Sequence, residues 1–279
     1  MERDKTMRPR KRFGQHWLTD QQILDEIVAA ANLQPTDRVL EIGPGKGALT
    51  SRLLPQVEAL LSVEIDRDLC KYMVKNYGDR PNFLLLEADY LQTDINEFLG
   101  DFPQFQNPRK VVANIPYNIT GPILEKLLGT IDRPNSNPFE SIVLLIQKEV
   151  GDRLVAHPCT KAFGALTLRV QYLADCETVC VVPPKAFYPK PKVESVVVRL
   201  RPRPLAQPAQ NPKLLATLIK VGFASKRKML RNNLKSLYNP EILDPIFADL
   251  DISPQARGEE VDLLQWIALS DRLNDYPKE

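Results

Sequence analysis

The stretch VLEIGPGKGALT, residues 39–50, joins a short apolar run to three glycines at every second position. Residues 39–42 are mostly apolar, as in a buried parallel strand, and the residues after the glycines have the pattern of a helix start. Because Gly43, Gly45 and Gly47 lack side chains, the backbone can turn sharply here and approach a ligand closely. The stretch therefore predicts a strand, a ligand-binding turn and a helix.

The chain on either side continues this alternation of strands and helices. Asp20 is placed to cap a helix, and a further helix is predicted around residues 165–173. Short apolar runs that predict strands lie at residues 38–42, 59–65, 83–87, 110–113 and 141–146. Two β-rich runs, 177–182 and 194–200, are expected to pair antiparallel at the edge of the sheet. The predicted fold is therefore α/β, with about seven strands in a mostly parallel sheet.

A proline-rich stretch predicts the domain division. Residues 201–212 contain Pro202, Pro204, Pro208 and Pro212, and such a stretch cannot form a helix interior or a central strand. Beyond it, leucine and isoleucine recur at helical spacing without strand patterns. We therefore predict a first domain over residues 1–200 that includes a basic N-terminal arm, a linker over 201–212, and a small all-helical domain over 213–279.

Composition bounds the class of protein. The chain has 279 residues, of which 43% are hydrophobic and 26% charged, as in a globular protein. No apolar run approaches the roughly 20 residues of a membrane span, and the charged N-terminus shows no secretory signal. The four cysteines lack metal-site spacing, and there are only two histidines. These features predict a cytoplasmic protein without a metal, and we expect a monomer because no apolar stripe stands out.

The distribution of charge predicts a polyanionic partner. The net charge is only +2, but basic residues cluster at residues 8–12, 185–203 and 220–235, whereas residues 241–279 hold ten acids against three basic residues. Such asymmetry suits a polyanion bound on one face. The candidate residues for contacts with this polyanion are Arg10, Lys11, Arg12, Lys190, Lys192, Lys226, Arg227, Lys228 and Arg231. The last four are expected to present their charge to phosphate groups from one helix.

The glycine turn fits two cofactor classes. Gly43, Gly45 and Ala48 also match the dinucleotide fingerprint, so an NAD enzyme stays open. Glu64, at the end of the second predicted strand, suits either cofactor, because a carboxylate there can bind both ribose hydroxyls.

Two acidic residues favour S-adenosylmethionine. Glu41 lies two residues before the first glycine, where a carboxylate would repel a pyrophosphate but attract the positive charge of a sulfonium and an α-amino group. Asp89 follows the third predicted strand and is placed to meet the adenine amine. A strand glutamate satisfied by backbone donors is the alternative for Glu41.

The tetrapeptide NIPY, Asn114 to Tyr117, follows the fourth predicted strand, in the crevice where open α/β sheets bind ligands. The N6 amine of adenine is a poor nucleophile, and its two hydrogens could be accepted by the Asn114 side-chain oxygen and the Ile115 carbonyl. Pro116 would stiffen the loop and Tyr117 would stack on the extruded base. Phe187 is a candidate second wall for the base, and a core position is its alternative.

With these motifs in place, the chain resembles the ribosomal RNA adenine N6-dimethyltransferases over nearly its whole length. The matching segments are KRFGQHWL at 11–18, EIGPGKGALT at 41–50, VEID at 63–66, EADYL at 87–91, NIPYNITGPIL at 114–124, QKEVGDRL at 147–154, FYPKPKVESVVVRL at 187–200 and FASKRKMLRNNL at 223–234. The resemblance implies a Rossmann-like class I methyltransferase domain with a helical C-terminal domain. It implies dimethylation of two adjacent adenosines in the 3′-terminal hairpin loop of 16S ribosomal RNA, within ribosome biogenesis.

The resemblance also assigns site residues. It implies cofactor contacts from residues that match the family pattern, with Gly45 shaping the loop: His16, Leu18, Gly43, Glu64, Asp89 and Asn114. Trp17 stands where the family is expected to have phenylalanine. The alternatives are a non-catalytic RNA-binding assembly or transcription factor, a DNA adenine methyltransferase, an NAD enzyme, and a large-subunit ribosomal RNA dimethylase. The basic C-terminal string favours the small ribosomal subunit as partner.

Overall fold

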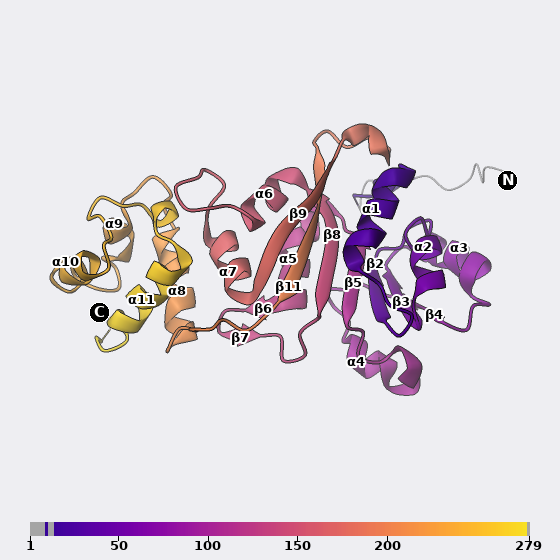
Figure 1. Cartoon of the computed structure of the whole chain (residues 1–279), viewed down its shortest axis with the longest axis horizontal. Coiled ribbons are helices and arrows are strands. Elements are labelled where there is room, and N and C mark those ends of the chain that lie inside the picture. Colours follow the sequence, from indigo (N-terminus) through magenta and orange to yellow (C-terminus); the bar gives the residue numbers. More distant parts are fainter. Residues whose placement is uncertain (1–8, 11–13, 278–279) are drawn as a thin grey trace. The chain divides into compact units, whose positions relative to one another are not determined.

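The computed structural model describes residues 9–10 and 14–277, and its centre is a seven-stranded sheet (Figure 1). The strand order is β4-β3-β2-β5-β8-β11-β9. The strands are β2 Arg38–Ile42, β3 Ala59–Glu64, β4 Phe83–Glu87, β5 Lys110–Asn114, β8 Ser141–Gln147, β9 Ala174–Val182 and β11 Ser195–Pro202. The predicted α/β class and seven-stranded sheet are confirmed.

Most of the sheet is parallel. Strands β2, β3, β4, β5 and β8 pair in parallel, and β11 pairs antiparallel with β8, with Val198 opposite Leu144. All six residues of β3 are buried, as expected for a strand covered on both faces. Strands β9 and β11 are neighbours at one edge, where the sequence analysis placed them.

Helices connect and cover these strands. They are α1 Gln21–Ala31, α2 Thr50–Leu53, α3 Arg67–Tyr77, α4 Ile95–Phe98, α5 Thr120–Leu128, α6 Lys148–Leu154 and α7 Ala165–Leu173. Single 3-10 turns lie at η2 Leu54–Gln56, η3 Leu99–Asp101, η4 Pro103–Phe105, η5 Tyr117–Ile119, η6 Pro184–Ala186 and η7 Gly258–Glu260. Asp20 caps α1 as predicted, because its carboxylate accepts hydrogen bonds from the backbone of Gln22 and Ile23.

Two short strand pairs lie outside the central sheet. Strand β1, Trp17–Leu18, pairs antiparallel with β10, Phe187–Tyr188, and β6, Gly129–Thr130, pairs with β7, Arg133–Pro134. The sequence analysis predicted neither pair, because strands of two residues show no periodicity. The β1–β10 pair ties the N-terminal segment to the connection between β9 and β11.

The chain forms two compact units. The first contains residues 1–127, 137–151 and 177–201, and the second contains residues 128–136, 152–176 and 202–279. The longest segment of the second unit begins in the proline-rich stretch. The unit also contains residues 128–136 and 152–176, which the predicted division assigned to the first domain. Within it, the Arg203 backbone donates to the Leu173 carbonyl, and the Ala209 backbone donates to the Tyr172 hydroxyl.

Four helices form the C-terminal part of the second unit: α8 Pro212–Gly222, α9 Leu230–Leu234, α10 Pro240–Asp249 and α11 Leu263–Leu273. Between residues 203 and 277 the structure contains no strand, as the sequence pattern predicted. One prediction was wrong: Lys226, Arg227 and Lys228 do not share a helix with Arg231, because they lie in turns before α9 begins.

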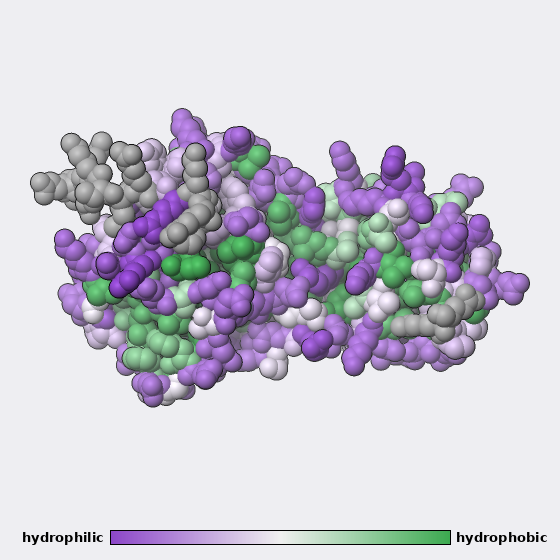
Figure 2. All heavy atoms as spheres, turned by 180° about the vertical axis from the view of Figure 1, so that it is seen from behind, coloured by the Kyte–Doolittle hydropathy of each residue, from purple (hydrophilic) through white to green (hydrophobic). Residues whose placement is uncertain are grey.

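The visible surface is mostly polar. Figure 2 shows a face that is largely hydrophilic, with hydrophobic residues gathered in small patches. Within residues 9–10 and 14–277, no helix is long and apolar enough to cross a membrane. In the same residues, no three histidine, cysteine or carboxylate side chains gather in a way that could hold a metal ion.

Candidate active site

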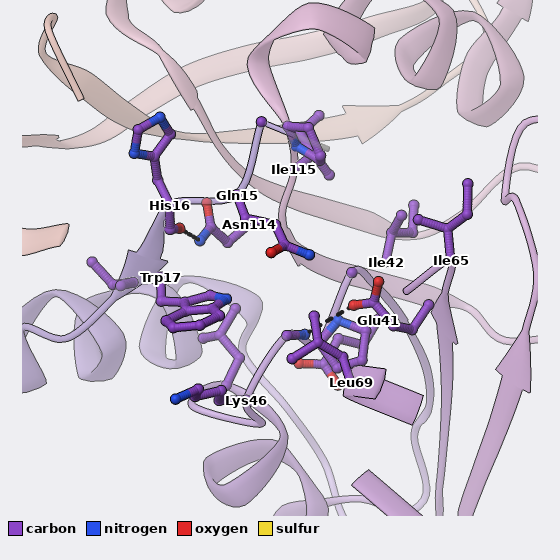
Figure 3. Close-up of a pocket in the computed structure, with 18 of the residues that line it drawn as sticks. Gln15, His16, Trp17, Glu41, Ile42, Lys46, Ile65, Leu69, Asn114 and Ile115 are labelled. Carbon is purple, nitrogen blue, oxygen red and sulfur yellow. Dashed lines mark hydrogen bonds between the residues drawn. The ribbon is translucent and has the colours of Figure 1, made fainter. Parts of the chain in front are cut away.

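A cavity of about 1140 Å³ lies at the carboxyl ends of the parallel strands (Figure 3). It is formed where β2, β3, β4 and β5 end, together with the N-terminal segment that contains β1. Of the twelve positions predicted for the site, eleven line this cavity: His16, Leu18, Glu41, Gly43, Gly45, Glu64, Asp89, Asn114, Ile115, Pro116 and Tyr117. These eleven residues lie up to 101 positions apart in the sequence, from His16 to Tyr117.

The glycine turn adopts a backbone that other residues rarely take. Gly43, Gly45 and Gly47 have φ values of 68°, 60° and 77°, in the left-handed region. At Gly47 a Cβ atom would lie 2.7 Å from the ring of Tyr77, so a side chain there would also clash. These two restrictions explain why the turn that leaves β2 carries glycine.

Glu41 is a buried carboxylate with one unused oxygen. Its side chain is 1% exposed, and Oε2 accepts hydrogen bonds of 2.7 Å from the hydroxyls of Thr50 and Ser62. Oε1 has no partner. Burial raises the pKa of Glu41 from 4.5 to about 7, against the lowering effect of the two hydroxyl donors. An unpartnered carboxylate oxygen beside a cavity is suited to a bound cation.

Glu64 is the last residue of β3 and contacts the glycine turn. Its Oε2 accepts from the Gly45 backbone at 3.2 Å, and its Oε1 accepts from the Asp66 backbone at 2.9 Å. Desolvation raises the pKa of Glu64 above its usual value. Each carboxylate oxygen has a second lone pair, so the two oxygens can also accept from a pair of vicinal hydroxyls.

Asp89 begins the loop that follows β4. Its Oδ1 accepts from the Leu91 backbone at 2.9 Å. The Lys126 ammonium fixes the same loop, because it donates to the carbonyls of Tyr90 and Thr93 and lies 4.7 Å from the centre of the Tyr90 ring. Asp89 therefore faces the cavity from a loop held by several contacts.

Asn114, the last residue of β5, has a defined amide orientation. Its Nδ2 donates to the His16 carbonyl at 3.1 Å, as drawn in Figure 3. This contact occupies the donor end of the amide, so the Oδ1 acceptor remains for a ligand in the cavity. Ile115 follows with 1% exposure, and its backbone donates to the Leu145 carbonyl at 3.4 Å.

Tyr117 is held from two sides. Its hydroxyl shares a 2.5 Å hydrogen bond with the hydroxyl of Ser195, the first residue of β11. Its ring stacks on the His16 imidazole, with centroids 5.9 Å apart and an angle of 18° between the planes. Burial raises the pKa of Tyr117, so the phenol stays neutral at physiological pH.

The N-terminal segment is bound to the site at several points. Arg10 and Gln15 both donate to the Asp66 carboxylate, at 3.0 and 3.1 Å, and Arg10 also pairs with Asp68. The His16 imidazole contacts the Pro189 carbonyl at 2.7 Å through Nδ1. Arg10, a candidate RNA contact, is therefore engaged within the protein.

Trp17 lies against the glycine turn. A Cβ atom at Gly45 would be 3.4 Å from its ring, and the Lys46 ammonium lies 4.3 Å from the ring centre. The buried indole Nε1 finds no hydrogen-bond partner in the part of the chain that the structure describes. Where phenylalanine was expected, this chain therefore places an additional donor at the cavity.

The structure does not bring Phe187 to the cavity. The residue is 2% exposed and packs in the hydrophobic core, because its neighbour in β10 takes the opposite side of the strand. That neighbour, Tyr188, lines the cavity. The core position that the sequence analysis gave as the alternative for Phe187 is the one observed.

The remaining candidate RNA contacts lie on the surface or outside the described residues. Five are exposed: Lys190, Lys192, Lys226, Arg227 and Lys228. Arg231 is partly buried and donates to both carboxylate oxygens of Asp244, at 3.0 and 3.1 Å. Lys11 and Arg12 lie outside the residues that the structure describes.

Several cavity residues were missed by sequence reasoning. They include Gln15, Lys46, Ile65, Leu69, Leu91 and Tyr188. Ile65 could have been predicted from sequence, because it directly follows Glu64 at a strand end. In the structure its apolar side chain is 46% exposed. Tyr188 could not be found in this way, because its place depends on the unpredicted β1–β10 pair.

Comparisons with known proteins agree with this geometry. Residues 6–275 match the family described as ribosomal RNA adenine dimethylase. The ribosomal RNA small subunit methyltransferase A of Trichormus variabilis is 60% identical over 267 residues, which cover 96% of this chain and 98% of the relative.

Two solved structures are similar along the chain. A dimethyladenosine transferase from Plasmodium falciparum is 27% identical with a TM-score of 0.73, and the match covers 93% of this chain and 98% of that one. The 23S rRNA methyltransferase ErmE is 26% identical with a TM-score of 0.71, and the match covers 93% of this chain and all (100%) of that one. The chain belongs to the ribosomal RNA adenine dimethylase family.

Proposed function

We propose that this protein transfers methyl groups from S-adenosylmethionine to the N6 atoms of two adjacent adenosines in the 3′-terminal hairpin loop of 16S ribosomal RNA, giving N6,N6-dimethyladenosine. Family membership and the name of the 60% identical relative support an enzyme that dimethylates adenine in small-subunit ribosomal RNA. The observation that carries the chemistry is the orientation of Asn114, whose amide oxygen is left for a ligand by the bond from Nδ2 to the His16 carbonyl.

The cavity fits S-adenosylmethionine, which supplies an electrophilic methyl group when bound. Glu41 offers an unpartnered buried oxygen for the positively charged amino-acid end. Glu64 can accept both ribose hydroxyls, and Asp89 can accept from the adenine amine. A pyrophosphate would place negative charge beside Glu41, so this carboxylate fits an NAD cofactor poorly.

Asn114 and Ile115 would raise the reactivity of the target amine. The lone pair of N6 is delocalised into the adenine ring, so the nitrogen is a weak nucleophile. When Asn114 Oδ1 and the Ile115 carbonyl accept its two hydrogens, the nitrogen can become more tetrahedral and direct its lone pair at the methyl group. The methylated ammonium then loses its proton to water, so no strong base is required.

Tyr117 would hold the extruded base. Removing an adenine from its stack costs a few kcal/mol, and stacking on an aromatic ring recovers about 1–3 kcal/mol per base. The Ser195 hydroxyl and the His16 ring fix the Tyr117 ring before the base arrives, so little conformational entropy is lost on binding.

The proposed substrate is the small ribosomal subunit, and it places the activity in the cytoplasm, where subunits mature. The exposed lysines and arginines of residues 190–192 and 226–228 would neutralise phosphates, which predicts that substrate affinity falls as salt is raised. We propose that the enzyme acts as a monomer, which gel filtration can test.

Methyl transfer to purified subunits tests this proposal. The protein is incubated with labelled S-adenosylmethionine and with small subunits that lack adenine dimethylation, large subunits, or adenine-containing DNA, followed by nucleoside analysis. The proposal predicts N6,N6-dimethyladenosine in the small subunit alone. Label in the large subunit would indicate the resistance-type dimethylase, and cofactor binding without transfer to any of the three would indicate a non-catalytic assembly factor.

A further inference from the structure

Tyr188 is an exposed aromatic residue at the edge of the active-site cavity. Its side chain is 64% exposed, although most large apolar side chains of the chain are buried. It also lines the cavity that contains Asn114 and Tyr117. An aromatic ring that faces both a cavity and solvent has a free surface for stacking.

The backbone of Tyr188 is fixed in place. It pairs with Trp17 in the β1–β10 ladder, and the adjacent Phe187 is anchored in the core. The carbonyl of the next residue, Pro189, contacts the His16 imidazole at 2.7 Å. The exposed ring therefore projects from a rigid segment, so a bound base would restrict little beyond its two side-chain torsions.

The same contacts connect Tyr188 to the slot for the target base. His16 bonds to Pro189 on one side and stacks on Tyr117 on the other. His16 therefore contacts both Tyr117 and Pro189, the residue that follows Tyr188. A nucleotide chain that places one base on Tyr117 would pass its next base along this edge of the cavity.

The charge around Tyr188 favours a nucleic-acid chain. Lys185, Lys190 and Lys192 are exposed within four residues of Tyr188, and Glu194 is the one acid in residues 185–194. Ammonium groups near an aromatic platform can neutralise the phosphates on either side of a stacked base.

We propose that Tyr188 stacks on the base next to the adenosine that occupies the cavity. The inference rests on the proposed function, since it requires an RNA substrate. Extrusion of one base exposes the face of its neighbour, which loses its stacking partner. The Tyr188 ring covers that face and so holds the RNA open while the methyl group is transferred.

Steady-state kinetics with small subunits test this role. Tyr188→Ala should raise KM for the subunit about tenfold, within the range expected for one lost stacking contact, and leave kcat nearly unchanged. Tyr188→Phe should behave like the parent protein, because it keeps the ring. Val193→Ala is the matched control: Val193 is 40% exposed in the same segment but does not line the cavity, so its KM should not change.

Binding of S-adenosylhomocysteine, measured by calorimetry, should be the same in all four proteins. An unchanged KM in Tyr188→Ala would overturn the inference, as would an equal loss in Tyr188→Phe or a weaker cofactor affinity in Tyr188→Ala alone. Failure of the proposed function has a different result: the parent protein itself would transfer no methyl group to the small subunit, and the inference would fall with it.

Discussion

At the scale of single residues, Glu41 carries an electrostatic cost because its carboxylate is buried. The fold buries its carboxylate and satisfies one oxygen with two hydroxyls, and the other oxygen has no partner among the described residues. Burial of a charge without full compensation favours the protonated form, which is why its pKa rises to about 7. Under the proposed function, a bound ammonium would supply the missing partner, and the stability lost in the free protein would be offset by cofactor affinity.

Cofactor affinity should therefore depend on pH. Only ionised Glu41 attracts the α-amino group, so affinity for S-adenosylhomocysteine should fall about tenfold between pH 8 and pH 6, across a pKa of about 7. Calorimetric titration at several pH values measures this. Glu41→Gln should bind more weakly at pH 8 and show a flat pH profile, and an equally steep profile in this variant would contradict the role of Glu41.

As the pH rises, the contribution of Glu41 to the stability of the free protein should fall, whereas cofactor affinity should rise. The pKa of Glu41 rises from 4.5 to about 7 on folding, so the native state holds the proton more tightly than the unfolded state. The stabilising contribution of protonated Glu41 is complete below pH 4.5 and is lost as the pH rises through about 7. Glu41→Gln should therefore raise Tm more at pH 8 than at pH 5, measured by calorimetry without cofactor.

At the scale of elements, the N-terminal segment closes one side of the cavity through contacts that are distant in sequence. Asp66 caps α3 by accepting from the Asp68 backbone, and it also binds Arg10 and Gln15. Helix capping and the attachment of this segment therefore depend on one carboxylate. The sequence predicted the strand that ends at Glu64, but pattern alone could not show what binds Asp66, because the two partners lie 51 and 56 residues away.

Asp66→Ala should consequently lower both stability and cofactor affinity. Loss of a helix cap costs about 1 kcal/mol, and release of the segment removes Trp17 and the His16 carbonyl from their places beside the cavity. Thermal melting and calorimetric binding of S-adenosylhomocysteine measure the two effects. Asp20→Ala is the matched control, because Asp20 caps α1 in the same way, whereas Arg10 and Gln15 bond to Asp66. Equal affinities in the two variants would contradict the attachment.

The elements that sequence could predict share one property. Strands β2, β3, β4, β5 and β8 are continuous apolar runs, so their positions follow within a residue or two from hydrophobicity alone. The β1–β10 pair has only two residues in each strand. As a result Tyr188 lines the cavity, and Phe187, which was the predicted candidate, packs in the core. Local pattern cannot decide which of two adjacent aromatic residues faces a ligand when a remote segment sets the strand direction.

At the scale of the whole molecule, order along the chain did not determine which segments pack together. Residues 128–136 and 152–176 belong to the second compact unit, because α7 packs against α8 and the Cys159 backbone donates to the Glu259 carbonyl. The sequence analysis divided the chain at its proline-rich stretch, which identified the start of the last segment of that unit. The cavity itself lies within the first unit, where the parallel strands end at one edge of the sheet, so strand ends and glycines were enough to place most of the predicted positions along it.

The measurement that tests the central claim most directly compares the parent protein with Asn114→Ala. Both are incubated with small subunits that lack adenine dimethylation, at saturating S-adenosylmethionine, and the modified adenosines are identified by mass spectrometry of RNA fragments. We expect N6,N6-dimethyladenosine at two adjacent positions with the parent protein, and a rate at least about 100-fold lower with Asn114→Ala, since a positioned hydrogen-bond partner of the reacting atom is lost. A variant that forms the product at the parent rate would contradict the account.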